Sequence, residues 1–406
     1  MHFTDMRLGI PVREHLAKLT FWKVVAMAIL AAGLYSTIYR FTRGLGPSTH
    51  LGDRFPWGIW IGFDVLCGDG LAAGGFTLAA IVYIFNIRRF EPVLRSTLLI
   101  AFLAYILVIV GMLFELGRPL RIWHSIIMWN PRSVMFEVGC CVVLYTTVLA
   151  LEFAPVVLER FRLKHSLMLM KKIYIAIIIL GVLLSTLHQS SLGSLYLIVP
   201  YKLYPLWYSP YLPVYFWISA VAAGCAMVIF AATVSARVFN RGIKIHLLND
   251  LARISSVMMG VYLMMKLADL YNRRLLSLLI VPREETCLYW LEIGIGAIAP
   301  VIWFSLSRVQ RNPRGLYLGA MMVILGFILN RVNVTITGME TYAGMHYFPS
   351  WMELSITAAI VTGGFIVFSL AVKHLPIFEH EEWYPAKAKT QAEEWGDDLA
   401  MVSRPY

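Results

Sequence analysis

Ten long apolar segments recur along the chain, separated by short polar connections. A helix needs roughly 20 apolar residues to cross a bilayer core of about 30 Å. The segments are longer than the alternating stretches of a membrane β-barrel, and an open strand would leave backbone groups unpaired in lipid. The pattern therefore predicts an all-α polytopic membrane protein. The expected spans are 22–39, 57–86, 96–116, 134–157, 172–190, 212–236, 252–271, 286–306, 315–337 and 353–373.

The composition supports a chain whose main solvent is lipid. Hydrophobic residues make up 59% of the chain and charged residues 15%, with a mean hydropathy of +0.69. Soluble globular proteins carry about 25% charged residues. No connection is long enough for a separate soluble domain. Residues 1–20 have basic side chains but no apolar core of a signal peptide, so we expect the first apolar segment to be retained as a helix.

The distribution of the basic residues predicts the orientation. Of 35 Lys and Arg, 23 fall on the side that carries both termini and 10 on the other, while Lys266 and Arg331 lie inside spans. Basic residues concentrate on the cytoplasmic side of inner-membrane proteins. We therefore expect a multi-pass protein of the bacterial inner membrane with both termini in the cytoplasm. The net charge of +11 is then an orientation signal and does not indicate nucleic-acid binding.

Cysteine and histidine usage argues against a metal centre in this chain. The five cysteines lie in apolar surroundings without a C-x-x-C pair, and an iron–sulfur cluster normally needs four thiolates. Of ten histidines, only His188 falls inside or at the end of an expected span, whereas a bis-histidine haem needs two facing imidazoles. We therefore predict no haem, iron–sulfur cluster or metal ion here.

Ionisable residues inside the spans are the first functional candidates, because charge in a membrane is costly. With 1.5 Å per residue, Asp64 lies about 12 Å and Asp69 about 20 Å from the outer end of the second span. Asp69 is surrounded by glycines from Gly68 to Gly75, which favours a lined cavity, although close helix packing also explains them.

The second half carries its own polar set, at Lys266, Asp269, Glu292 and Arg331. We interpret Lys266, Glu292 and Arg331 as an interhelical salt bridge in preference to a ligand site. For Asp269, simple solvation at a helix end is as good an explanation as a functional role. Residues 194–213 form an aromatic-rich apolar loop, which suits a docking surface or a lid.

Five motifs carry a resemblance to a known family. They are FPWGIWIGFDVLCGDGLAAGGF (55–76), ELGRP (115–119), NPRSVMFE (130–137), HQSSLGSL (188–195) and YFPSWMEL (347–354). Together they resemble the NrfD-like family of quinone-reactive membrane subunits, in its ten-helix branch with the membrane subunits of uptake hydrogenases and of menaquinone reductase. The likeness covers essentially the whole chain.

The resemblance implies an organisation in two four-helix bundles, 57–190 with the quinone site and 212–337, flanked by helices 22–39 and 353–373. The remaining segments are a cytoplasmic N-terminal segment (1–21), a periplasmic loop (191–211) and a cytoplasmic tail (374–406). It also implies menaquinone as substrate, no haem, and a periplasmic iron–sulfur subunit as partner. That subunit would connect to a hydrogenase, a molybdopterin-like or a multihaem cytochrome subunit.

Quinone chemistry suggests which residues form the site. A quinone takes up two protons with two electrons, so its oxygens need acid groups within hydrogen-bond reach. Asp64, Glu115 and His188 come from three spans of the first half and lie toward the same outer face. We expect them at the headgroup, and the surrounding residues to be Trp57, Trp60 and Arg118. Arg118 could instead hold Glu115 ionised.

A proton route from the cytoplasm would complete the chemistry. Asp69, Tyr105 and Tyr145 lie near the midplane, and Glu152 marks a cytoplasmic entrance. The further members of the predicted route are Thr146, Thr147, Ser185 and Glu137. The alternative to a proton route is that the two tyrosines are packing residues and that Asp69 is a neutral, hydrogen-bonded acid of the core. The sequence thus predicts the quinone-reducing subunit of a periplasm-facing oxidoreductase, with an ion-coupled transporter or a passive anchor as alternatives.

Overall fold

The computed structural model describes residues 21–238 and 244–377, and in this part of the chain it is helical without named strands. Within these residues, ten helical stretches are long and apolar enough to cross a membrane, which confirms the predicted all-α polytopic fold. They are Phe21–Arg43, Trp60–Ile84, Arg88–Glu115, Val134–Arg160, Lys164–Ile198, Leu212–Val238, Ile245–Asn272, Glu284–Ser305, Pro313–Ala343 and Trp351–His374. The expected N-terminal segment and most of the expected tail lie outside the described residues.

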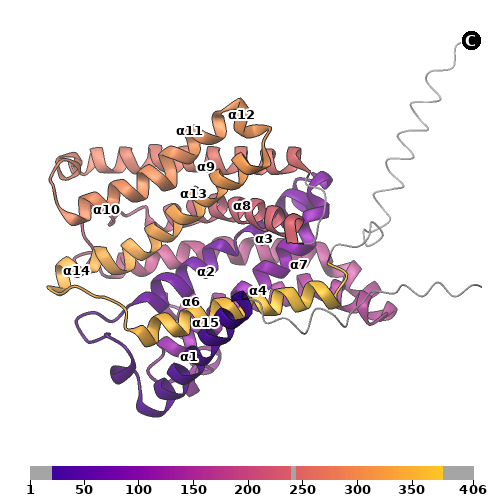
Figure 1. Cartoon of the computed structure of the whole chain (residues 1–406), viewed down its shortest axis with the longest axis horizontal. Helices are drawn as coiled ribbons and strands as arrows, with labels where there is room; N and C mark the ends of the chain where they lie inside the picture. The colour runs from indigo at the N-terminus through magenta and orange to yellow at the C-terminus, as the bar shows by residue number, and fades with distance from the viewer. Residues whose placement is uncertain (1–20, 239–243, 378–406) are drawn as a thin grey trace, which may run out of the picture.

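Several spans are assembled from more than one helical element (Figure 1). In the first half the elements are α1 (Phe21–Arg43), η2 (Trp60–Val65), α2 (Leu66–Leu71), α3 (Gly74–Ala79), η3 (Ala80–Ile84), η4 (Arg88–Phe90), α4 (Glu91–Glu115), α5 (His124–Ile127), α6 (Val134–Arg160), α7 (Lys164–Ser194) and η6 (Leu195–Ile198). In the second half they are α8 (Leu212–Val238), α9 (Ile245–Asn272), η7 (Leu276–Leu279), α10 (Glu284–Ile293), η8 (Gly294–Ile298), α11 (Ala299–Ser305), α12 (Ser307–Gln310), α13 (Pro313–Val332), η9 (Asn333–Thr337), α14 (Gly338–Ala343) and α15 (Trp351–His374). Short turns η1 (Gly46–Ser48) and η5 (Pro119–Arg121) lie in connections.

Consecutive spans run in opposite directions between the two ends of the molecule. We call them the Trp60 end, where the second span begins, and the Ile84 end, where it finishes. The predicted orientation places the Trp60 end in the periplasm. In Figure 1 the Trp60 end is on the side of α14.

The helices extend beyond the predicted apolar windows because backbone hydrogen bonding continues where basic side chains reach the interface. The fifth span begins at Lys164 instead of residue 172, and the seventh at Ile245 instead of 252. His165, His246 and His374 consequently also lie in helices, but they are exposed near the Ile84 end. His188 alone among these four is buried.

In the part of the chain that the structure describes, four spanning segments are π-helical, a feature that the hydropathy pattern did not predict. They are η2, η3, η8 and η9. Asp64 lies within η2, Glu292 lies two residues before η8, and Arg331 two residues before η9. Single-turn π segments in helices occur frequently at functional sites. Three of the four therefore accompany a buried ionisable residue.

Packing brings distant parts of the chain together. The first and last spans, α1 and α15, lie side by side (Figure 1), with Ser36 and Ser355 hydrogen-bonded at 2.7 Å. Helix α3 meets α8 so closely that a Cβ added at Gly224 would lie 2.4 Å from the Gly74 nitrogen. The glycines of the second span therefore serve close packing. The grouping into two four-helix bundles stays a prediction.

The aromatic-rich loop before α8 is packed against the second half. Leu203, Tyr204, Leu206 and Trp207 are buried, and the Tyr204 amide donates to the Gly338 carbonyl at 2.7 Å. This loop therefore covers the Trp60 end of the second half, and its role as a docking surface or a lid stays a prediction.

Candidate functional site

Asp64 and Glu115 are two acids at the Trp60 end that lie within electrostatic range of one another, and each is contacted by a flanking helix. The Asp64 Oδ2 atom accepts a hydrogen bond of 2.7 Å from the Thr357 hydroxyl of α15. Glu115, at the end of α4, lies within electrostatic range of Asp64, Arg40 and Glu353. Its Oε2 atom is buried and has no hydrogen-bond partner among the described residues. Asp64 is buried and Glu115 half-buried, and Glu115 keeps unused hydrogen-bonding capacity.

Arg40 of α1 is the cation of this cluster. It is 2% exposed and donates to the carbonyls of Phe114 at 3.0 Å and Leu116 at 2.9 Å. Those carbonyls belong to the C-terminal end of α4, where a positive charge is favourable. Arg40 therefore holds the C-terminal end of α4 in place, and its positive charge offsets the partial negative charge of that helix end. Arg118, which we expected near Glu115, is exposed in the following loop.

Glu353 is fully engaged in structural contacts. It forms a capping box with Ser350 at the start of α15, and its carboxylate also accepts from the His50 amide and the Tyr347 hydroxyl. The Trp60 indole donates to the Glu353 carbonyl at 3.4 Å. Glu353 and Trp60 therefore build the wall of the cluster, and Asp64 and Glu115 are its chemically available acids.

A second polar group lies deeper in the first half. His188 Nε2 and Asp69 Oδ2 are 2.9 Å apart, and both side chains are 0% exposed. The neighbouring Gln189 donates from Nε2 to the Asp69 carbonyl at 3.1 Å. In the described part of the chain, Asp69 Oδ1, His188 Nδ1 and Gln189 Oε1 are buried without a partner. Such atoms are normally satisfied by ordered water.

A row of buried polar groups continues from this pair toward the Ile84 end. The Tyr105 ring lies 5.9 Å from His188 and 4.7 Å from Tyr145. Tyr145 lies beside Ser185 and within electrostatic range of both Asp69 and Glu152. The Glu152 side chain is 2% exposed and packs against Gly181, where an added Cβ would lie 2.1 Å from its Oε1 atom.

This row has unused hydrogen-bonding capacity along its length. Within the described residues, the hydroxyls of Tyr105, Tyr145 and Ser185 and the Glu152 Oε2 atom form no close hydrogen bond. With water between them, such groups can pass a proton along the row.

The remaining predicted site residues lie around these groups. Trp57 is half-buried and packs edge-on against Tyr196, with ring centres 5.7 Å apart. Glu137 accepts a hydrogen bond from Ser191 near the Trp60 end. Thr146 and Thr147 donate to carbonyls of their own helix, at 2.6 and 2.8 Å. The structure thus places Asp64 within electrostatic range of Glu115, whereas His188 is paired with Asp69.

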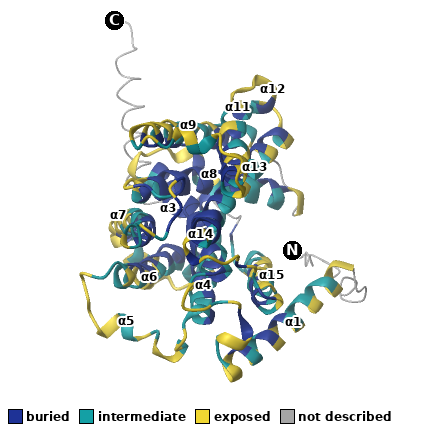
Figure 2. Cartoon of the chain, turned by 90° about the vertical axis from the view of Figure 1, so that its left-hand side faces the viewer, coloured by how far each residue is buried: buried dark blue, intermediate teal, exposed yellow. Residues whose placement is uncertain are grey.

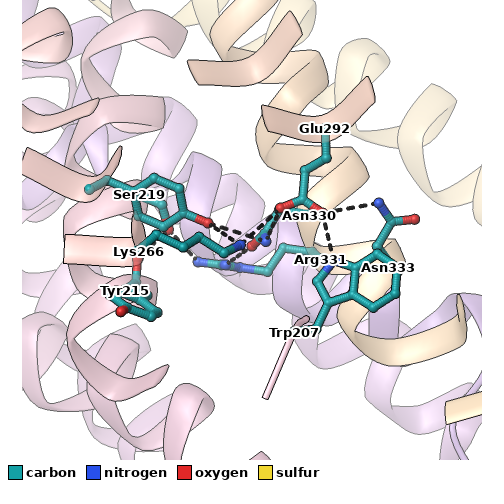
Figure 3. A network of polar contacts seen from close by, with 9 residues as sticks. Trp207, Tyr215, Ser219, Lys266, Glu292, Asn330, Arg331 and Asn333 are labelled. Atoms are coloured by element: carbon teal, nitrogen blue, oxygen red, sulfur yellow. Dashed lines mark hydrogen bonds and ion pairs between the residues drawn. The ribbon is translucent and has the colours of Figure 1, made fainter. Parts of the chain in front are cut away.

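The second half contains a separate buried network centred on Glu292 (Figure 3). Lys266 Nζ lies 3.3 Å from Glu292 Oε1, which forms the predicted interhelical ion pair. The carboxylate also accepts from Asn330 at 2.7 Å, Asn333 at 3.0 Å and the Trp207 indole at 2.8 Å. A cavity of about 20 Å³, enough for one water molecule, lies beside it.

The two other members of the predicted set have different partners. The Arg331 guanidinium donates to Ser219 at 2.9 Å and to Asn330 at 2.6 Å, and it lies 3.6 Å from the centre of the Phe216 ring. Asp269 forms an ion pair with Arg273 at 2.6 Å. The geometry of this network suits a structural role, in which it holds α8, α9, α10 and α13 together.

We expect replacement of Glu292 by Leu to lower the stability of the protein strongly. The change leaves Lys266 buried without a counter-charge, and breaking a buried pair costs about 3–5 kcal/mol. The midpoint of thermal unfolding in detergent measures the effect, with Glu284→Gln, an exposed acid on the same helix, as control. Replacing both partners, as Lys266→Met with Glu292→Leu, should restore much of the loss. An unchanged midpoint for Glu292→Leu contradicts this structural role of the network.

Three residues of the first cluster were missing from the predicted site: Arg40, Glu353 and Thr357. All three belong to the flanking helices, to which the sequence interpretation gave no role. Ser350 and Glu353 carry the spacing of a capping box, a signal for the start of α15. No signal in the sequence indicates that α1 and α15 would meet beside Asp64.

The fold and these sites define a polytopic membrane protein with buried acids at one end and a polar row toward the other. Residues 47–343 match the family model described as polysulphide reductase, NrfD, and the chain belongs to this family.

Curated relatives cover nearly the whole chain. A relative described only as a protein, from Nitratidesulfovibrio vulgaris, is 36% identical over 89% of this chain and 96% of its own length. The probable Ni/Fe-hydrogenase 2 b-type cytochrome subunit of Escherichia coli is 33% identical over 84% and 88%, respectively. The menaquinone reductase integral membrane subunit of N. vulgaris is 28% identical over 91% and 94%.

The name of the E. coli relative includes a b-type cytochrome, which contrasts with the histidine usage of this chain. His188 uses its Nε2 atom to contact Asp69. The described residues contain no group of three or more His, Cys, Asp or Glu that could hold a metal ion. The absence of haem from this subunit stays a prediction.

Proposed function

We propose that this chain is the quinone-reactive membrane subunit of a respiratory oxidoreductase. It passes electrons between a periplasmic iron–sulfur partner subunit and menaquinone in the inner membrane, and reduces the quinone with protons from the cytoplasm. The observation that carries the proposal is the set of two neighbouring acids, buried Asp64 and half-buried Glu115, continued inward by the row from Asp69 to Glu152.

The geometry suits proton-coupled quinone chemistry. Asp64 and Glu115 can protonate the two oxygens of a headgroup bound at the Trp60 end, between η2, α4 and α15. Trp60 and Asp64 are buried there, whereas Glu115 is half-buried. The electrons come from outside this chain, and the names of the relatives, menaquinone reductase, selenate reductase and Ni/Fe-hydrogenase subunits, support redox partners of that kind.

The deeper groups then supply the protons. Glu152 takes up a proton near the Ile84 end, and Tyr145, Ser185 and Tyr105 pass it inward with ordered water. The Asp69–His188 pair receives it below the headgroup, about 7–8 Å along the helix from Asp64. This assignment gives His188 the role of a proton relay, whereas Asp64 and Glu115 contact the headgroup.

The complex in which the chain resides tests the proposed class. Purification under mild detergent should recover this chain with an iron–sulfur subunit and bound menaquinone, and the complex should reduce a menaquinone analogue. The ionisable network of the second half makes an ion-coupled transporter the alternative. Ion-driven solute flux by the isolated chain in liposomes, without bound quinone, contradicts the proposal.

The orientation has its own test. We expect green fluorescent protein fused after Arg404 to fluoresce and alkaline phosphatase fused there to be inactive, because the basic residues concentrate on the side of both termini. A phosphatase fusion within the loop before α15 should be active. The reverse pattern places the Trp60 end in the cytoplasm and removes the proposed access of a periplasmic partner.

A further inference from the structure

The connection between α4 and α6, residues 116–133, exposes large apolar side chains outside the ten spans. The exposed fractions are 90% for Leu120, 61% for Ile127 and 70% for Trp129. Trp123, Ile126 and Met128 are each exposed by half or more. Contiguous apolar surface of this kind on a protein normally contacts a partner or a membrane.

The position of this connection indicates which of the two covers it. Helix α5 packs on the flank of α6, where Ser125 would contact a Cβ added at Gly139 at 3.7 Å. Gly139 lies about 8 Å along α6 from its first residue, within the predicted membrane span. The connection therefore folds back beside α6 toward the membrane. Figure 2, seen from the end that carries α14, shows α5 outside the outline of the packed helices.

The side chains of α5 are sorted accordingly. His124 and Ser125 are half-buried, whereas Ile126 and Ile127 are exposed. The Trp129 indole donates to the Ile126 carbonyl at 2.8 Å, so its polar atom is satisfied within the connection. The exposed apolar side continues onto α6 through Met135, which is 54% exposed. The connection thus extends the lipid-facing surface of α6.

The charge of the connection is complementary to anionic lipid. Arg118, Arg121 and Arg132 are exposed, and residues 116–133 contain no Asp or Glu. Tryptophan and arginine together are typical of segments at the membrane–water interface, where the rings lie at headgroup level and basic side chains attract anionic lipids.

We propose that residues 116–133 form an interfacial anchor, which lies in the headgroup zone at the Trp60 end. It inserts Leu120, Trp123 and Ile127 toward the acyl chains and binds phospholipid phosphates through Arg121 and Arg132. The anchor is independent of the quinone site, because it rests on exposure, position and charge alone.

Spin labels measure the environment of the connection in the assembled complex, reconstituted in phosphatidylglycerol nanodiscs. The background is Cys140→Ala with Cys287→Ser, which removes the two cysteines that are not buried. Labels at Leu120→Cys and Ile127→Cys should collide more with oxygen, which enriches in lipid, than with a water-soluble nickel chelate. Leu144→Cys, on the exposed side of α6, is the lipid reference, and Asp53→Cys, exposed in a turn, is the aqueous reference.

Each other outcome overturns the proposal. Nickel collisions as frequent as at Asp53→Cys place the connection in water. Infrequent collisions with both reagents place it beneath a partner protein.

The arginines are tested by the pair Arg121→Gln and Arg132→Gln. In phosphatidylglycerol this double variant should raise the nickel accessibility of the label at Ile127→Cys at least twofold, whereas in phosphatidylcholine the variant and its parent should agree. Equal accessibility in phosphatidylglycerol means that these side chains bind no lipid phosphate.

Discussion

Asp64→Asn and Glu115→Gln should each reduce menaquinone turnover by about 100-fold or more in the assembled complex. General acid catalysis contributes roughly 10²–10⁴-fold, and the amide side chains keep the size of the carboxyls but cannot deliver a proton. Both acids lie against α15 or α1, within a cluster that supplies no third available acid among the described residues. Turnover with a menaquinone analogue, at saturating electron donor, measures the effect.

Two controls separate catalysis from assembly in this experiment. Asp53→Asn changes an exposed acid at the same end and should leave turnover unchanged. Electron transfer from the donor to the iron–sulfur partner should also persist in every variant. Wild-type turnover in fully assembled Asp64→Asn and Glu115→Gln variants rejects the headgroup site.

Asp69→Asn should abolish charge movement across the membrane while quinone reduction remains measurable. Of the two carboxyls in the row, Asp69 is the one nearer the proposed headgroup site. It lies 2.9 Å from His188, and both side chains are out of contact with solvent. Without it, protons from the Ile84 side cannot reach the headgroup, and the quinone must take protons from the Trp60 side. Its reduction then no longer moves charge.

Proteoliposomes measure this difference directly. A potential-sensitive dye reports the membrane potential generated per electron transferred, and Asp250→Asn, which changes an acid paired with Arg89 near the Ile84 end, is the matched control. Generation of a membrane potential by Asp69→Asn at the wild-type ratio removes Asp69 from the route. Loss of all quinone reduction would instead assign Asp69 to the headgroup site.

The spans were predictable because bilayer thickness imposes a length on every apolar segment. The same reasoning failed at helix ends such as Lys164, where basic side chains continue a helix beyond the apolar core. The π-helical segments could not be predicted from hydropathy either, because hydropathy carries no information on which carbonyl each backbone amide contacts.

The membership of the candidate site was only partly predictable. Depth along the spans placed Asp64 and Glu115 near one another, and in the structure they lie within electrostatic range. Depth contains no rotational register, so it did not indicate that His188 would face Asp69. The contribution of α15 depends on a contact across 293 residues of chain, between Asp64 and Thr357, which only the packed fold specifies.

The central claim, that this chain binds menaquinone at its Trp60 end, is tested most directly by photoaffinity labelling. An azido-menaquinone analogue, activated in the purified complex, should label peptides that contain Asp64, Glu115 or Thr357, and excess menaquinone should prevent the labelling. The Asp64→Asn variant should be labelled less. Labelling confined to the second half or to another subunit, or labelling that menaquinone does not displace, contradicts the claim.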